Sequence, residues 1–127
     1  MATRPSFTSG DIFTAVNANI LATSIVALNT QAGTAYTAAL TDVGKLINFT
    51  SGTAVAFTIP ANATVAFSVG DQLNIFQAGT ATVTITPAAT VTVRSAGSKL
   101  TTDTQFAVAT CIKIDTNEWI ALGNLKA

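Results

Sequence analysis

The clearest strand signal in this chain is Ala81-Thr-Val-Thr-Ile-Thr86, in which threonine and apolar side chains alternate strictly. Successive side chains of a β-strand point to opposite faces, so Val83 and Ile85 share one face and the threonines share the other. Similar short runs, separated by small turn residues, continue from Tyr36 to Leu125. Strands at about ten-residue spacing with no helix between them predict a mainly β fold, an antiparallel β-sandwich or a jelly-roll-like or barrel module.

Turn residues divide this region into successive strands. We expect one hairpin over residues 45–59, around Ser51-Gly-Thr53, and a final one over residues 106–122, around Asp115-Thr-Asn117. Loops of this length that contain glycine or Asp and Asn are typical of hairpins.

The apolar faces of these strands predict the core. Val55, Phe57 and Ile59 alternate with smaller residues and therefore share one buried face. Phe106 is expected in the core as well, because it lies beside Val and Ile in its strand. Trp119, on the final strand, belongs either in the core or at a seam between subunits.

The chain divides at about residue 34, where the apolar period changes from helical to strand-like. Residues 1–33 are expected to form an N-terminal arm and helix for attachment or oligomerisation, and residues 34–127 the β domain. The arm, residues 2–11, contains Pro5 and Gly10 and is too polar to pack by itself.

The spacing of apolar residues at intervals of three and four predicts an α-helix over residues 14–28, with Thr14 as its N-cap. Two apolar stripes lie side by side on it, which is too broad for a helix of about four turns that packs on nothing. The helix packs either on its own β domain or against copies from other subunits, and the pattern leaves both open. The residues that would then form a trimer interface are Val16, Ile20, Leu21, Ile25 and Leu28.

The composition is apolar and almost uncharged. Hydrophobic residues make up 49% of the chain, charged residues 9%, and the net charge is zero, whereas a typical soluble domain carries about 25% charged residues. Either the many Thr and Ser hydroxyls keep an ordinary β domain soluble, or its uncharged faces are covered by other chains in an oligomer or a larger particle.

Several classes of partner are disfavoured. Nucleic acid binding needs clustered cations, and the six here are scattered: Arg4, Lys45, Arg94, Lys99, Lys113 and Lys126. The most apolar stretch, residues 12–28, is interrupted by polar residues, which argues against a membrane span. The first residues lack the features of a secretory signal, so the chain is expected to fold in the cytoplasm where it is made.

Catalytic devices are also disfavoured. The chain has no His, which excludes Ser-His-Asp and His-based zinc sites. The lone Cys111 lies in an apolar run and is expected to be a small core or interface side chain. Asp115 and Glu118 are the one close pair of acids, and they flank a predicted loop, where a solvated turn is the expected role. We therefore expect no enzyme activity, no metal and no cofactor.

Short motifs along the β region resemble a recurrent module of tailed-bacteriophage virion proteins. They are Tyr36-Thr-Ala-Ala-Leu-Thr-Asp-Val-Gly-Lys-Leu-Ile47, Phe57-Thr-Ile-Pro60, Phe67-Ser-Val-Gly-Asp-Gln-Leu-Asn-Ile75, Val91-Thr-Val-Arg-Ser-Ala-Gly-Ser-Lys-Leu100 and Trp119-Ile-Ala-Leu-Gly123. Thr8-Ser-Gly-Asp-Ile-Phe-Thr-Ala-Val-Asn17 is similar to the segment that often begins such proteins. The module occurs in tail fibres, head fibres and capsid decoration proteins, and the resemblance implies a homotrimeric structural protein.

These observations lead to one expected function and one alternative. The expected function is a homotrimeric capsid decoration, or cement, protein on the surface of the virion, bound to the major capsid protein or other virion proteins through Phe7, Ile12 and Phe13 of the arm. The alternative is a short tail or head fibre subunit that binds a receptor or glycan on the host surface. Tail-fibre chains usually continue into a receptor-binding tip after this module, which favours the first.

Overall fold

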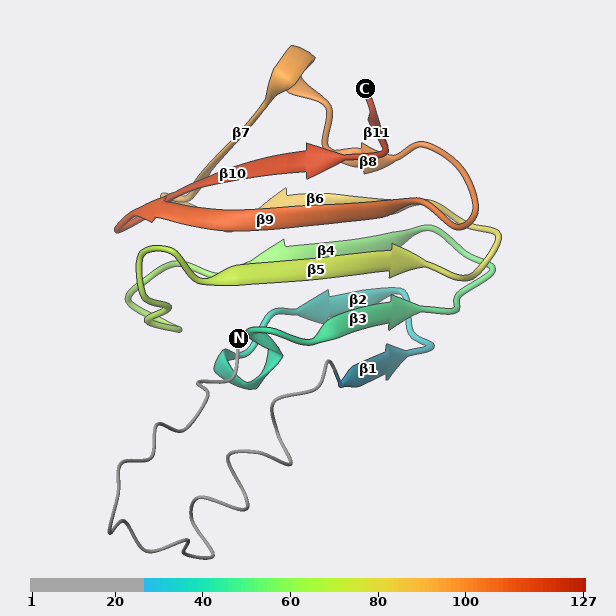
Figure 1. Cartoon of the computed structure of the whole chain (residues 1–127), viewed down its shortest axis with the longest axis horizontal. Helices are drawn as coiled ribbons and strands as arrows, with labels where there is room; N and C mark the ends of the chain where they lie inside the picture. Colours follow the sequence, from blue (N-terminus) through green and yellow to red (C-terminus); the bar gives the residue numbers. More distant parts are fainter. Residues whose placement is uncertain (1–26) are drawn as a thin grey trace, which may run out of the picture.

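The structure, a computed structural model, describes residues 27–127. Two β-sheets lie face to face and enclose the core between them (Figure 1). In chain order the elements are β1 (Leu28–Gln31), β2 (Ala35–Thr37), the 3₁₀ turn η1 (Leu40–Asp42), β3 (Leu46–Phe49), β4 (Val55–Ile59), β5 (Gln72–Gln77), β6 (Val83–Pro87), β7 (Thr92–Ser95), the 3₁₀ turn η2 (Ala96–Ser98), β8 (Thr101–Thr102), β9 (Val108–Asp115), β10 (Glu118–Gly123) and β11 (Leu125–Lys126). The expected mainly β fold is thereby confirmed.

The chain crosses from one sheet to the other after nearly every strand. The six-stranded sheet has the order β1-β3-β5-β9-β10-β7, and the five-stranded sheet has the order β11-β8-β6-β4-β2. Strands β1, β3 and β5 are parallel neighbours in the first sheet, and β2, β4 and β6 are parallel neighbours in the second. The chain from β1 to β6 is thus a flattened coil, each turn of which contributes one strand to each sheet.

The predicted antiparallel arrangement is wrong for these first six strands. Residues 45–59 do not form a hairpin, because β3 and β4 lie in different sheets and the loop between them crosses from one layer to the other. Antiparallel pairing begins later, where β9 pairs with β5 and β10, and β8 pairs with β6 and β11. The predicted final hairpin is confirmed as β9 and β10. Both sheets are mixed, unlike those of a jelly roll, whose strands are antiparallel.

Two turns of the coil repeat with the same offset. Leu46 pairs with Asn74 and Val55 pairs with Val83, so both sheets relate β3–β4 to β5–β6 by 28 residues (74 − 46 and 83 − 55). Parallel, in-register pairing places equivalent side chains on the same face. Ile47 therefore lies beside Ile75 in the core.

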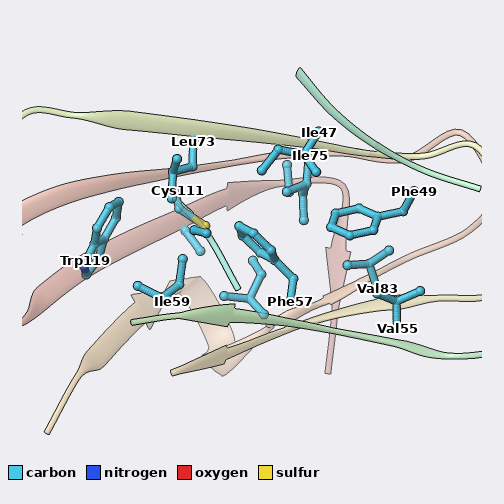
Figure 2. Close-up of a cluster of buried hydrophobic side chains, with 14 of the residues drawn as sticks. Ile47, Phe49, Val55, Phe57, Ile59, Leu73, Ile75, Val83, Cys111 and Trp119 are labelled. Atoms are coloured by element: carbon cyan, nitrogen blue, oxygen red, sulfur yellow. The ribbon is translucent and has the colours of Figure 1, made fainter. Parts of the chain in front are cut away.

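The inner faces of the two sheets form one hydrophobic core, shown in Figure 2. Phe57 is fully buried between the sheets and its ring packs edge-on against Phe49, with 5.7 Å between the ring centroids. Val55, Ile59, Val83 and Ile85 are buried as their alternating pattern predicts, and all lie on the five-stranded sheet.

Loops of successive turns of the coil also lie in backbone contact with one another. Gly79 lies against the loop of the preceding turn, where its amide donates to the carbonyl of Phe49 at 2.9 Å. A Cβ at Gly79 would lie 2.2 Å from the carbonyl oxygen of Ser51, a distance at which backbone would have to move. Glycine is thus required here by the close approach of two backbone segments.

The N-terminal predictions fall almost entirely outside the described residues. These include the arm, the attachment residues Phe7, Ile12 and Phe13, and the greater part of the helix of residues 14–28. The end of that helix was placed wrongly, because Leu28 is the first residue of β1 and pairs with Leu46 of β3. The sheet structure therefore begins several residues before the expected boundary near residue 34.

The face assignment predicts a large difference between two substitutions on the five-stranded sheet. Phe57→Ala removes a fully buried ring and should lower the free energy of unfolding by about 3–5 kcal/mol. Thr84→Ala alters an outward, exposed residue on β6 and should cost about 1 kcal/mol or less. Urea unfolding of both variants measures the difference, and equal losses would show that the assigned faces are wrong.

Candidate functional site

The outer face of the six-stranded sheet is the candidate functional site. Since Ile47, Ile75 and Cys111 point into the core, the residues between them in their strands point outward. The strand register aligns these outward residues in rows across the sheet. One row runs through Leu28, Leu46, Asn74, Thr110 and Leu122.

Two further rows continue the same face. One contains Thr30, Asn48, Phe76 and Val108, and the other contains Gln72, Ile112, Ile120 and Arg94. The ring of Phe106, at the edge of the second row, stacks on Phe76 with 6.3 Å between the centroids. We call this surface the apolar outer face, and its hydrophobic members are Leu28, Leu46, Phe76, Phe106, Val108, Ile112, Ile114, Ile120 and Leu122.

Much of this hydrophobic surface is open to solvent. Seven large hydrophobic side chains are exposed in the described part of the chain, and five of them, Leu28, Phe106, Val108, Ile114 and Leu122, belong to the apolar outer face. Phe106 is 65% exposed and Leu122 is 50% exposed. Single exposed apolar residues are ordinary, but a contiguous apolar surface marks a site of interaction.

The outer face of the five-stranded sheet has a different composition. Its outward residues align Thr37, Thr58 and Thr86 in one row, and Ala35, Ala56, Thr84 and Thr101 in another. Hydroxyl and methyl groups cover this surface, and it has no large apolar side chain in these rows. The sandwich thus has one apolar and one hydroxyl-rich outer face, a difference that packing of the shared core does not require.

Charge is nearly absent from the apolar outer face. Arg94 on β7 and Glu118 on β10 lie at one margin of the sheet, where the guanidinium of Arg94 donates to the carboxylate of Glu118. The polar residues between the apolar ones are uncharged amides and hydroxyls. Asn74 Oδ1 accepts hydrogen bonds from Gln72 Nε2 at 2.8 Å and from Thr110 Oγ1 at 2.9 Å.

A polar network that the sequence did not reveal surrounds Asp42, which is buried in η1. Its Oδ1 accepts from Asn29 Nδ2 at 2.7 Å, and its Oδ2 accepts from the Tyr36 hydroxyl at 2.7 Å and from the Ala39 amide at 2.8 Å. These bonds join β1, β2 and η1 at the edge of both sheets. Burial raises the pKa of Tyr36, and its hydrogen bond to Asp42 raises this pKa further.

A second network contains a buried cation. Lys113 occupies an inward position on β9 and is only 2% exposed. Its Nζ donates to Asn62 Oδ1 at 2.6 Å and to the carbonyl of Phe67 at 2.7 Å. The backbone amide of Asn62 in turn donates to Asn117 Oδ1 at 2.9 Å. The ammonium group therefore holds the loop between β4 and β5 against the final hairpin, which is a structural role.

The lone cysteine and the close pair of acids, Asp115 and Glu118, occupy structural positions. Cys111 is buried in the core, as expected, and burial raises the pKa of its thiol to about 12, so the nucleophilic thiolate is disfavoured. Asp115 Oδ1 accepts from the Thr116 amide at 2.7 Å in the turn of the final hairpin, and Glu118 pairs with Arg94. No group of three His, Cys, Asp or Glu side chains that could hold a metal occurs among residues 27–127.

The structure shows the position of Trp119, which the sequence left open, and corrects that of Phe106. Trp119 lies in the core, where it is 1% exposed and packs edge-on against Phe67 with 5.4 Å between the centroids. The prediction of a buried Phe106 is wrong. Phe106 has a φ of 70° and precedes β9, which begins at Val108, so the strand alternation does not extend to it.

A shallow hollow lies beside β7. It has a volume of about 240 Å³ and lies between η2, β10 and β11. Among residues 27–127, Lys99 contributes the only charged group that lines this hollow, and no carboxylate lines it. Ligand sites usually combine an apolar wall with several convergent polar groups, which this hollow lacks.

Comparisons of the chain with protein-family models, curated protein sequences and solved structures find no match.

Of the predicted trimer-interface residues only Leu28 is described, and it lies at a corner of the apolar outer face, 64% exposed. The other four, Val16, Ile20, Leu21 and Ile25, lie outside the described residues. No helix within residues 27–127 is long and apolar enough to cross a membrane.

The Asp42 network predicts the titration of the only tyrosine in the chain. The rise in absorbance at 295 nm with pH reports the ionisation of Tyr36 alone, and its midpoint should lie above the ordinary value of about 10 in the folded protein and return to it in denaturant. Because the folded pKa is raised, the linked stability is present below pH 10 and is lost as the pH rises through the folded pKa. Asp42→Asn should lower the midpoint, and an unchanged midpoint would contradict the proposed contact.

The Lys113 network predicts a loss of stability without the lysine. Lys113→Met leaves Asn62 Oδ1 and the Phe67 carbonyl without their donor and should lower the free energy of unfolding by about 2–4 kcal/mol. The matched control is Lys99→Met, which alters an exposed lysine and should have little effect. Chemical denaturation of both variants tests this, and the expectation fails if their midpoints agree.

Proposed function

We propose that this chain is a homotrimeric capsid decoration protein of a tailed bacteriophage, with a structural role on the surface of the virion. The observation that carries the proposal is the apolar outer face, a broad and nearly uncharged surface that an isolated subunit exposes to water. Such a surface is typical of a protein whose work is association. The sequence resemblance to a phage virion module indicates that the protein associates with a phage particle.

The physical action of such a protein is passive reinforcement. A trimer that contacts several neighbouring capsid subunits at once combines modest contacts through effective concentration, so that the whole assembly binds tightly. The hydroxyl-rich outer face of the five-stranded sheet suits the side that meets water, because threonine hydroxyls remain hydrated there. In this arrangement the N-terminal arm, with Phe7, Ile12 and Phe13, would provide the attachment to the major capsid protein.

The proposal predicts how the protein binds particles. Purified protein added to capsids that lack it should appear by electron microscopy as additional density at many sites over the shell. A variant without residues 2–13 should keep the melting temperature of the β domain but bind the particles more weakly. Density at the tail or at a few positions would favour the fibre alternative, and full binding by the truncated variant would transfer attachment to the β domain.

A further inference from the structure

We propose that the apolar outer face of the six-stranded sheet binds the same face of other copies of this chain, with three such faces turned toward a common axis. The inference rests on the homotrimer of the proposed function and assigns the surface that forms it. Three flat faces around an axis enclose a triangular prism. The half of each face near β1 then meets the half near β10 of its neighbour, and the hydroxyl-rich faces point outward.

The charge distribution favours another copy over an unrelated partner. The chain has no net charge, so copies do not repel one another. The charged groups at one margin of this face, Arg94 in its third row and Glu118 beside that row, are paired with each other. No unbalanced charge is left to select a partner of opposite sign, and a surface of this kind is complementary to its own uncharged copy.

The polar groups on the face are also suited to an identical surface. Asn48, Gln72, Asn74 and Thr110 present both donors and acceptors between the apolar side chains. Amides and hydroxyls of this kind can pair with those of an identical face.

The area of the face sets the size of the contacts that it can form. Six strands at about 4.8 Å spacing extend over about 24 Å, and because these strands have four to eight residues their mean length is about 18 Å. The flat projection is therefore roughly 400–500 Å², and the side chains add accessible area to it. Each subunit divides this area between its two neighbours, so one pairwise contact uses about half of it, less than the about 800 Å² that a standard interface buries on each partner. The three contacts act together, and lasting contacts between identical chains are the more hydrophobic ones.

The test introduces charge on each outer face in turn, in the full chain. Val108→Lys combined with Leu122→Lys places two ammonium groups on the apolar outer face, whereas Thr37→Lys combined with Thr84→Lys places two on the hydroxyl-rich face. All four residues are exposed in the subunit. Light scattering at micromolar concentration should give a threefold loss of mass for the first variant and no loss for the second, with circular dichroism to verify folding.

A second measurement covers the case in which the first variant fails to fold. Val108→Cys should allow a short bismaleimide to link subunits covalently, whereas Thr84→Cys on the opposite face should not. An intact trimer of the first lysine variant, or cross-linking from Thr84→Cys alone, would overturn this assignment while leaving the trimer itself in place. A monomeric wild-type chain would overturn both the assignment and the proposed trimer, and a trimer that binds no capsid would overturn only the decoration role.

Discussion

The parallel, in-register stacking of successive turns is the constraint on which the rest of this structure depends. Because β3 and β4 repeat as β5 and β6 with one offset, backbone hydrogen bonds join equivalent residues, and inward side chains fall into columns such as Ile47 with Ile75. The same stacking brings the loops into backbone contact at Gly79. It also gives each sheet a second, outward set of columns, whose composition the core does not determine.

The outward residues of the six-stranded sheet have a composition that the fold itself does not require. Strands of a two-layered β protein need one apolar face each, and the five-stranded sheet follows that rule, with threonines outside and Val83 and Ile85 inside. The six-stranded sheet is apolar on both faces, as strands covered on both sides are. The proposed trimer, in which a neighbouring copy buries Phe76 and Ile120, gives a reason for a pattern that folding of the single subunit does not require.

Local features were predictable from the sequence, and the topology was not. Alternation placed Phe57 and Trp119 on strands and identified the final hairpin, because a period of two is a property of one strand alone. The same alternation fits an antiparallel hairpin and a parallel crossing between sheets, so residues 45–59 were misjudged. The 28-residue offset was the available signal, visible in Val55-Ala-Phe-Thr58 and Val83-Thr-Ile-Thr86, which have alternating apolar residues and end alike.

The candidate face could be predicted by the same reasoning, although the buried charge of Lys113 could not. Once β9 and β10 are paired, Ile112 and Ile120 must lie on the side opposite Cys111, so a second apolar face follows from register. The inward position of Lys113 could not be predicted, because a lysine usually points outward. Its ammonium group is stable there only because Asn62 Oδ1 and the Phe67 carbonyl, from a loop distant in sequence, accept its hydrogen bonds. The outer face needs no such compensation, since it has almost no charge to desolvate. In the proposed trimer, apolar area and shape therefore determine the association of this face, and ionic strength has little to screen.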